Sequence, residues 1–258
     1  MSERRRLRAL VTGAASGIGL GLGGYLAARG HAVWLSDRVR ADVEQAAREL
    51  SRQGHTVQGL ELDVTSDASL HQAVQSLGDG GVDLLVNNAG LQHVDPLEDF
   101  PPERWAQLVA VMLTGPAMVI RALLPGMRRR NFGRIVNVGS IHSLVASPYK
   151  SAYVAAKHGL TGLTKTLALE TADVDVTVNT ICPAYVRTPL VDAQVAAQAR
   201  AHGISEQRVI DEIMLKPMPK HAFVEIDELG ALVEYLSSDA ARNVTGQSIA
   251  IDGGWTAQ

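Results

Sequence analysis

Seven short apolar runs alternate with longer helical patterns along this chain, and this order restricts the fold more than any other feature. The strand candidates span residues 7–11, 32–36, 57–62, 84–87, 134–138, 177–181 and 248–251. The helix candidates span residues 17–29, 40–53, 66–77, 102–129, 151–171 and 227–236. The runs are rich in Val, Ile and Leu without strict alternation, which is typical of strands covered on both faces. The pattern therefore predicts an α/β fold with one doubly wound, parallel, seven-stranded sheet.

Length and composition are those of one domain with a large core. The chain has 258 residues, 46% of them hydrophobic, and we expect a single domain over residues 1–258. A single cysteine, Cys182, excludes an internal disulfide and favours a cytoplasmic location. The net charge of −3 gives no reason to expect nucleic-acid binding. One cysteine with scattered histidines predicts no metal site, and no run of about 18 uninterrupted apolar residues predicts a membrane span.

Residues 188–222 interrupt the alternation between the sixth strand and the last helix. Amphipathic patterns cover residues 190–201 and 206–215 of this insertion. An insertion after the carboxyl end of a strand lies where ligands bind in such sheets. We therefore expect a helical lid over the substrate, with a packed helical hairpin as the alternative.

A glycine-rich loop follows the first strand and opens the next helix, as in Rossmann-type dinucleotide sites. Glycine lets backbone amides approach a phosphate, and the helix start supplies donors and partial positive charge. A tight strand-to-helix turn also needs glycine, so the loop alone is weak evidence for a nucleotide. The cofactor contacts expected here are Gly13, Ser16, Gly17, Ile18 and Gly19.

Asp37 ends the second strand, where an acid can accept hydrogen bonds from the adenosine ribose and repel a 2′-phosphate. This favours NAD over NADP. The neighbouring Arg38 weakens the inference because a guanidinium can grip a phosphate or stack on adenine. Asp37 can also serve as a helix N-cap. Further cofactor contacts are expected after the third, fourth and sixth strands, at Asp63, Val64, Asn88, Ala89, Gly90, Pro183, Val186 and Thr188.

Tyr153 and Lys157 are four residues apart on one predicted helix, and hence on one face. A cation ~4 Å from a phenol, at an effective dielectric of ~20, favours the phenolate by about 4 kcal/mol. This predicts a lowered pKa for Tyr153 and a role as acid/base catalyst, with Lys157 also contacting the cofactor. Ser140 follows the fifth strand and is expected to hold the substrate oxygen, or else to cap a turn. Together with the glycine loop, these residues predict hydride transfer at an alcohol carbon, although Tyr-x-x-x-Lys by itself is also a common surface pair.

The ordered motifs resemble the short-chain dehydrogenase/reductase family across almost the whole chain. They are Thr12-Gly-x-x-x-Gly-Ile-Gly19, Asn87-Asn-Ala-Gly90, Ser140, Tyr153-x-x-x-Lys157, Cys182-Pro183, Thr188-Pro189 and Asp252-Gly-Gly254. Within that family, Asn88-Ala-Gly-Leu-Gln-His-Val94 and Ser147-x-x-Lys-Ser-Ala-Tyr-Val-Ala-Ala-Lys-His158 are similar to the bacterial D-3-hydroxybutyrate dehydrogenases. This resemblance implies reversible, NAD-dependent oxidation of D-3-hydroxybutyrate to acetoacetate by a homotetramer.

The same resemblance assigns four residues to the substrate carboxylate: Gln92, His142, Lys150 and Gln194. Lys150 would supply the charge and the other three further donors, because a small anion must replace its lost water. Each of the four is, taken alone, equally typical of an ordinary surface position. Their joint agreement with one pattern predicts a small carboxylic acid as substrate.

Three departures from the family pattern bear on function. Met112 stands where the family usually has an asparagine, Ala184 replaces the glycine after Pro183, and Arg187 replaces the usual leucine near the nicotinamide end. We expect Arg187 to be able to alter substrate preference. Two other functions stay open: reduction of an acetoacetyl thioester or another small carbonyl compound, and nucleotide sensing without catalysis.

Overall fold

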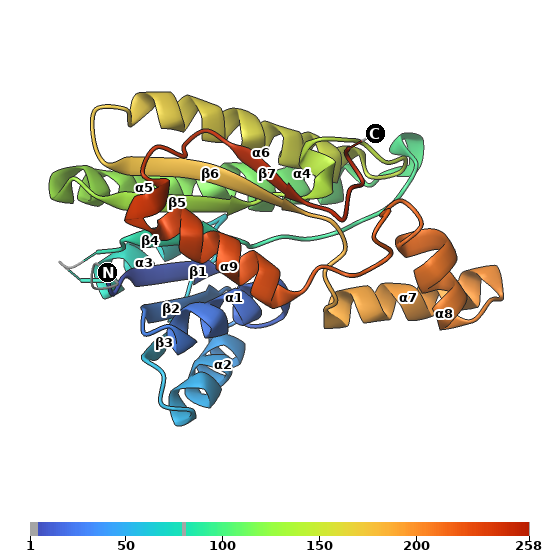
Figure 1. The fold of residues 1–258 in the computed structure, drawn as a ribbon, viewed down its shortest axis with the longest axis horizontal. Helices are drawn as coiled ribbons and strands as arrows, with labels where there is room; N and C mark the ends of the chain where they lie inside the picture. The colour runs from blue at the N-terminus through green and yellow to red at the C-terminus, as the bar shows by residue number, and fades with distance from the viewer. Residues whose placement is uncertain (1–4, 79–80, 258) are drawn as a thin grey trace.

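The computed structural model describes residues 5–78 and 81–257. It contains one sheet of seven parallel strands in the order β3-β2-β1-β4-β5-β6-β7 (Figure 1). The strands are β1 Arg8–Thr12, β2 Ala32–Asp37, β3 Val57–Glu61, β4 Leu84–Asn87, β5 Gly133–Val138, β6 Val176–Pro183 and β7 Ser248–Ile251. The prediction of a doubly wound, parallel, seven-stranded sheet is therefore confirmed.

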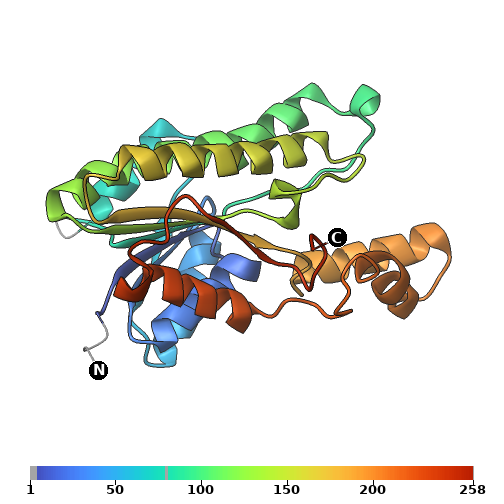
Figure 2. The same ribbon diagram turned by 45° about the horizontal axis from the view of Figure 1, so that its top comes forward.

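Helices cover both faces of the sheet. They are α1 Gly17–Ala28, α2 Arg40–Arg52, α3 Asp67–Ser76, α4 Pro102–Val109, α5 Gly115–Arg130, α6 Ser151–Glu170, α7 Pro189–His202, α8 Glu206–Val209 and α9 Ile226–Ser237. In Figure 2 the green and yellow helices α4, α5 and α6 lie above the sheet, and α1 and α9 lie below it. All strands are parallel, but the strand order reverses at β1, with β2 and β3 on one side and β4 to β7 on the other. This reversal creates a topological switch point between β1 and β4.

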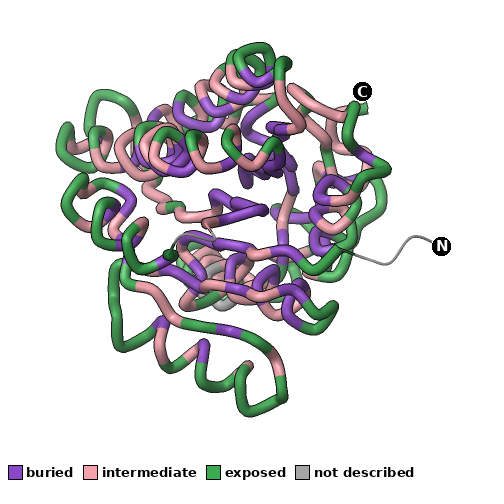
Figure 3. The backbone as a smooth tube through the Cα atoms, turned by 90° about the vertical axis from the view of Figure 1, so that its left-hand side faces the viewer, coloured by how far each residue is buried: buried purple, intermediate pink, exposed green. Residues whose placement is uncertain are grey.

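Each face of the sheet packs its own apolar cluster. Leu22, Leu35 and Leu229 belong to the cluster under α1 and α9, and all three are fully buried. Leu85 and Ile120 belong to the cluster under α3 and α5. Figure 3 shows buried residues concentrated along the strands and on the inward sides of the helices. Burial on both faces explains why the strands lack an alternating polar pattern.

A π-helical turn, Ala110–Thr114, separates α4 from α5. The N–H of Gly115 bonds to the carbonyl of Ala110, five residues back, where an α-helix would use the residue four back. The next residue, Pro116, has no N–H to donate. The helical segment predicted over residues 102–129 is confirmed as a continuous helical run, with one π-helical turn that was not predicted. The turn presents the side chain of Met112 to the interior, where it is 1% exposed.

The helical segment over residues 102–130 is, by length and composition, apolar enough to cross a membrane. No such span was expected from the sequence. The buried side chains of Val119, Ile120 and Leu123 pack against the sheet. Core helices pass the same test of length and composition, and packing against the sheet accounts for these three buried residues of the segment.

The insertion folds into α7 and α8, which project from the body of the molecule beside the end of the sheet (Figure 1). A second π-helical turn, Ile210–Met214, follows α8. The insertion has a small core of its own, in which Val195, Val209 and Met214 are buried. These contacts hold α7 and α8 together as one unit; a lid function stays a prediction.

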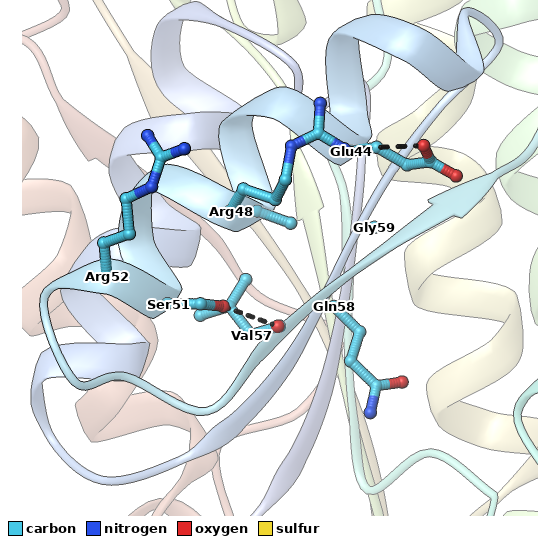
Figure 4. A pocket seen from close by; sticks show the side chains of 8 residues that line it. Glu44, Arg48, Ser51, Arg52, Val57, Gln58 and Gly59 are labelled. Atoms are coloured by element: carbon cyan, nitrogen blue, oxygen red, sulfur yellow. Dashed lines mark hydrogen bonds and ion pairs between the residues drawn. The ribbon is translucent and has the colours of Figure 1, made fainter.

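A shallow groove of about 630 Å³ lies between α2 and the edge strand β3. Figure 4 shows Arg48 and Arg52 along it, and the Ser51 hydroxyl donates to the Val57 carbonyl at 3.0 Å. A Cβ on Gly59 would lie 2.9 Å from Glu44 Cα, so glycine is needed for α2 to approach the strand. None of the residues predicted for the site lines this groove, and we regard it as a product of helix packing.

Candidate active site

A cleft of about 550 Å³ opens at the carboxyl edge of the sheet, where β1 and β4 diverge. Loops after all six strands from β1 to β6 contribute to its lining, as do α6 and α7. The predicted residues that line it are Gly13, Ser16, Gly17, Ile18, Asp37, Asp63, Val64, Asn88, Ala89, Gly90, Gln92, Ser140, His142, Lys150, Tyr153, Lys157, Val186, Thr188 and Gln194. Among the described residues, Gly19 and Pro183 are the predicted cofactor contacts that lie outside this lining.

The glycine loop takes a conformation that only glycine adopts readily. Gly13 and Gly17 have φ values of 62° and 58°. A Cβ on Gly13 would lie 2.6 Å from Ala89 Cα, and one on Gly19 would lie 2.5 Å from the Gly13 carbonyl oxygen. Gly19 therefore serves the packing of the loop rather than the cleft surface. Because the loop leads directly into α1, the free N–H groups of the first helical turn suit a pyrophosphate.

The loop after β4 is fastened to the end of β1. The Thr12 hydroxyl accepts hydrogen bonds from the backbone N–H groups of Asn88 and Ala89, at 3.0 and 3.1 Å. The Asn88 side chain donates in return to the carbonyls of Thr12 and Gly13, both at 2.9 Å. These bonds fix the two edges of the switch point relative to each other.

Two carboxylates, predicted to contact the adenosine of the cofactor, line one end of the cleft. Within residues 5–78 and 81–257, Asp37 receives only long hydrogen bonds, from the N–H groups of Ala15 at 3.4 Å and Val39 at 3.5 Å. The N-cap of α2 is Val39, so the alternative of Asp37 as a helix cap is wrong. Asp63 accepts from the backbone and hydroxyl of Thr65, at 2.9 and 2.6 Å. The carboxylate of Asp37 therefore retains acceptor capacity for ribose hydroxyls.

α6 brings Tyr153 and Lys157 to the floor of the cleft. The Lys157 amine lies 5.7 Å from the centre of the Tyr153 ring and donates to the Val138 carbonyl at 2.6 Å. Burial lowers the pKa of Lys157 to about 8. Burial also raises the pKa of Tyr153, although the Ser140 hydroxyl opposes the rise. The prediction of a lowered pKa for Tyr153 is thus wrong for this structure, because desolvation of the buried phenol outweighs the hydrogen bond from Ser140.

Ser140 follows β5 directly and caps a short 3₁₀-helix, Ile141–Ser143. Its hydroxyl accepts a hydrogen bond of 3.1 Å from the backbone N–H of His142. The hydroxyl also lies near enough to Tyr153 to favour the phenolate. The capping alternative for Ser140 is therefore confirmed, and its contact with the substrate oxygen stays a prediction.

A partly buried cation lies beside these groups. The Lys150 amine is 3.4 Å from His142 Nε2, and burial lowers the pKa of Lys150. The pKa of His142 falls to about 4, first through burial and then through the Lys150 ammonium. An ammonium can only donate, so Nε2 of the neutral imidazole accepts and orients Lys150. The direct donation to a carboxylate predicted for His142 stays a prediction.

Other lining residues were not predicted from the sequence. They include Leu91, Gln107, Tyr185, Val191 and Trp255. The Trp255 ring lies 6.1 Å from the rings of both His142 and Tyr185 and forms an apolar wall. Its position just after the last strand was the available signal, since that is where parallel strands present their ligand contacts.

Two of the departures can now be placed. Met112 lines the cleft, whereas Arg187 does not. The Arg187 guanidinium pairs with Asp192 at 3.3 Å and lies over the Phe223 ring. Arg187 therefore contacts the base of α7 rather than the substrate space.

Residues 8–199, well over half of the chain, match the family described as short chain dehydrogenase. The chain belongs to the short-chain dehydrogenase family. It is therefore an oxidoreductase of a family that uses nicotinamide cofactors, and the cleft described above is the place where this fold presents its ligands.

Relatives in this family match the chain over nearly its whole length. The chain is 46% identical over 257 residues to a D-beta-hydroxybutyrate dehydrogenase of Rhizobium meliloti, covering 97% of this chain and 98% of the relative. It is 48% identical over 252 residues to a D-beta-hydroxybutyrate dehydrogenase of Cupriavidus necator, with the same coverage. Among solved structures, a variant of actinorhodin polyketide ketoreductase with NADPH matches with a TM-score of 0.91 and 32% identity over 99% of both chains.

Proposed function

We propose that this short-chain dehydrogenase catalyses the reversible oxidation of D-3-hydroxybutyrate to acetoacetate with NAD. The observation that carries the proposal is the partly buried Lys150 amine held 3.4 Å from His142, in the same cleft as Tyr153 and Lys157. Among the described residues, no carboxylate forms an ion pair with this amine, and such a cation suits an anionic substrate. The full-length similarity to two D-beta-hydroxybutyrate dehydrogenases supports the same substrate.

Each side chain has a defined task in this proposal. Lys150 pairs with the substrate carboxylate, His142 orients Lys150, and the amides of Gln92 and Gln194 complete the anion site. Gln92 is suited to donate, since its Oε1 already accepts from the N–H of His93 at 3.1 Å. The apolar ring of Trp255 excludes water from the remaining space.

The acid/base step uses Tyr153 and Lys157 on α6 and Ser140, which follows β5. Ser140 holds the substrate hydroxyl, and Tyr153 removes its proton in the phenolate form. Because burial raises the pKa of Tyr153, formation of the phenolate depends on the Ser140 hydroxyl and on the Lys157 ammonium. Lys157 stabilises the phenolate from below while it stays anchored to the Val138 carbonyl. When bound, the nicotinamide ring supplies the hydride acceptor for carbon three of the substrate. In the reverse direction the Tyr153 hydroxyl returns the proton.

The preference for NAD rests on Asp37. Its carboxylate lines the cleft and, from the part of the chain that the structure describes, receives only long hydrogen bonds, so it can accept from both ribose hydroxyls. The same charge repels a 2′-phosphate. Arg38 lies beside it in the lining and is available to stack on the adenine.

We extend the proposal to the insertion and the assembly. Residues 188–222 act as a lid, because α7 carries Gln194 into the cleft while α7 and α8 pack around a core of their own. The single catalytic domain rests on the length of the chain and the cytoplasmic location on its single cysteine, while the homotetramer rests on the resemblance to the hydroxybutyrate dehydrogenases.

Absorbance of NADH in parallel assays tests the proposed reaction. We expect rapid NAD reduction with D-3-hydroxybutyrate, little with the L enantiomer, and little NADH oxidation with an acetoacetyl thioester. The Tyr153→Phe variant should bind NAD nearly as well as the parent and turn over at least about 100-fold more slowly. Faster turnover of the thioester than of the free acid would overturn the substrate assignment, and near-parental turnover of the variant would overturn the role of Tyr153.

A further inference from the structure

Ser143 forms a closed pair of hydrogen bonds with Ser140. The Ser143 hydroxyl accepts from the backbone N–H of Ser140 at 3.2 Å, and the N–H of Ser143 donates to the Ser140 carbonyl at 2.8 Å. The Ser143 side chain is buried, with 3% of its surface exposed. Water therefore has no access to replace these bonds if the hydroxyl is removed.

The surroundings of Ser143 leave its hydroxyl little freedom. A Cβ on Gly139 would lie 2.7 Å from Ser143 Oγ, and Gly139 itself is tied to β6 by a bond of 2.8 Å to the Ile181 carbonyl. Cys182, which is fully buried, lies on the other side and interacts with Ser143. Burial raises the pKa of the Cys182 thiol, so this neighbour keeps its proton and carries no charge.

We propose that Ser143 is a positioning residue that fixes the Ser140 hydroxyl against Tyr153. The inference rests on the proposed roles of Ser140 and Tyr153. Ser143 touches neither substrate nor cofactor in this account; it acts only through the turn that carries Ser140. The Ser140 hydroxyl favours the Tyr153 phenolate, so any loosening of the turn weakens that effect.

Removal of the Ser143 hydroxyl should raise the pKa of Tyr153. Replacing Ser143 with alanine leaves the Ser140 N–H without its acceptor, and the turn shifts or rotates to find another. The Ser140 hydroxyl then contacts Tyr153 less well, and the pKa of Tyr153 rises further. At a fixed pH less phenolate is present, and kcat for oxidation falls by about tenfold while KM changes little.

Titration of tyrosinate absorbance measures the pKa of Tyr153 without any assumption about the substrate. The chain has five tyrosines, and subtracting the spectrum of Tyr153→Phe in each background isolates Tyr153. We expect a higher titration midpoint in Ser143→Ala, one at least as high in Ser140→Ala, and no further rise in the double variant. An unchanged midpoint in Ser143→Ala, or a rise that adds to that of Ser140→Ala, would overturn the proposal.

Two further variants serve as controls for a general loss of structure. Ser151→Ala removes another buried hydroxyl, one without a hydrogen-bond partner among the described residues, and should leave both midpoint and kcat unchanged. Ser143→Thr retains the acceptor and should keep kcat within about twofold of the parent and the parental midpoint. A loss in Ser143→Thr or Ser151→Ala equal to that in Ser143→Ala would also count against the proposal. Failure of the parent to oxidise hydroxybutyrate would overturn the proposed function but leave the titration result standing.

Discussion

The amine of Lys157 lies 2.6 Å from the carbonyl oxygen of Val138, the last residue of β5. Ser140 follows two residues later on the same strand end, so a single strand positions both the cation and the hydroxyl of the acid/base group. Because the amine is buried and its pKa is lowered to about 8, its charge is held in the cleft at a free-energy cost. We therefore expect Lys157 to contribute to the proposed activity and not to stability.

Replacing Lys157 with methionine should separate those two properties. We expect kcat to fall by at least about 100-fold, since the phenolate of Tyr153 loses its stabilising cation. The free energy of unfolding should not fall by more than about 1 kcal/mol, because the variant no longer buries an ammonium. Initial rates and urea denaturation measure the two effects. A large loss of stability without a loss of turnover would contradict this reasoning.

Replacing Lys150 with alanine should weaken substrate binding selectively. We expect KM for hydroxybutyrate to rise by about 100-fold, because the bound carboxylate loses its ion pair, while Kd for NAD stays unchanged. Steady-state kinetics and nucleotide titration provide both numbers. Lys165→Ala, on the exposed side of the neighbouring helix α6, is the matched control and should change neither. Equal effects of Lys150→Ala on substrate and nucleotide would argue against a carboxylate anchor.

Replacing Asp37 with alanine should shift cofactor preference toward NADP. Removing the carboxylate removes acceptors for the ribose and repulsion of the 2′-phosphate, and Arg38 remains to bind that phosphate. We expect the ratio of kcat/KM for NAD to that for NADP to fall by about 10- to 100-fold. Asp42→Ala, an exposed position in the first turn of α2, should leave the ratio unchanged. An unaltered ratio in Asp37→Ala would remove the basis for the NAD assignment.

His142 should make stability depend on pH in the acid range. The unfolded imidazole takes up a proton near pH 6.5, whereas the folded one does so only near pH 4. The unfolded state therefore binds more protons in this window, and stability falls as the pH falls through it. The full difference is roughly 3 kcal/mol. It is present above pH 6.5 and lost by pH 4.

Urea denaturation at several pH values measures this dependence. The decline between pH 6.5 and 4 should be much smaller in His142→Gln, whereas the exposed His71→Gln should follow the parent. A parental decline in His142→Gln would mean that other groups control acid stability.

Much of the fold could be predicted from the sequence, because parallel strands that are buried on both faces are continuous runs of Val, Ile and Leu. The bounds of β4 and β7 were predicted to the residue. The π-helical turn at Ala110–Thr114 was not predicted, because it depends on whether the Gly115 N–H bonds four or five residues back, and hydrophobic periodicity does not distinguish the two. The composition of this segment is the same for an α-helix and for a helix with one π turn.

The site was predictable where it depends on strand ends and less so where it depends on solvation. Asp37, Ser140 and Asn88 lie in the cleft because the carboxyl ends of parallel strands meet at one edge. The pKa of Tyr153 was misjudged because a pairwise attraction to Lys157 was considered without the opposing desolvation. Trp255 was missed as a lining residue because its distance from His142 depends on how the tail folds back after β7.

A Cβ on Gly13 would lie 2.6 Å from Ala89 Cα, so the end of β1 and the loop after β4 must be compatible with each other although they are far apart in the sequence. A chimaera that takes β1 from one parent and the loop after β4 from another must match Thr12 and Gly13 to Asn88 and Ala89, whose amides share one hydroxyl. Recombination breakpoints between these stretches are therefore tolerated only among parents with the same residues at this junction.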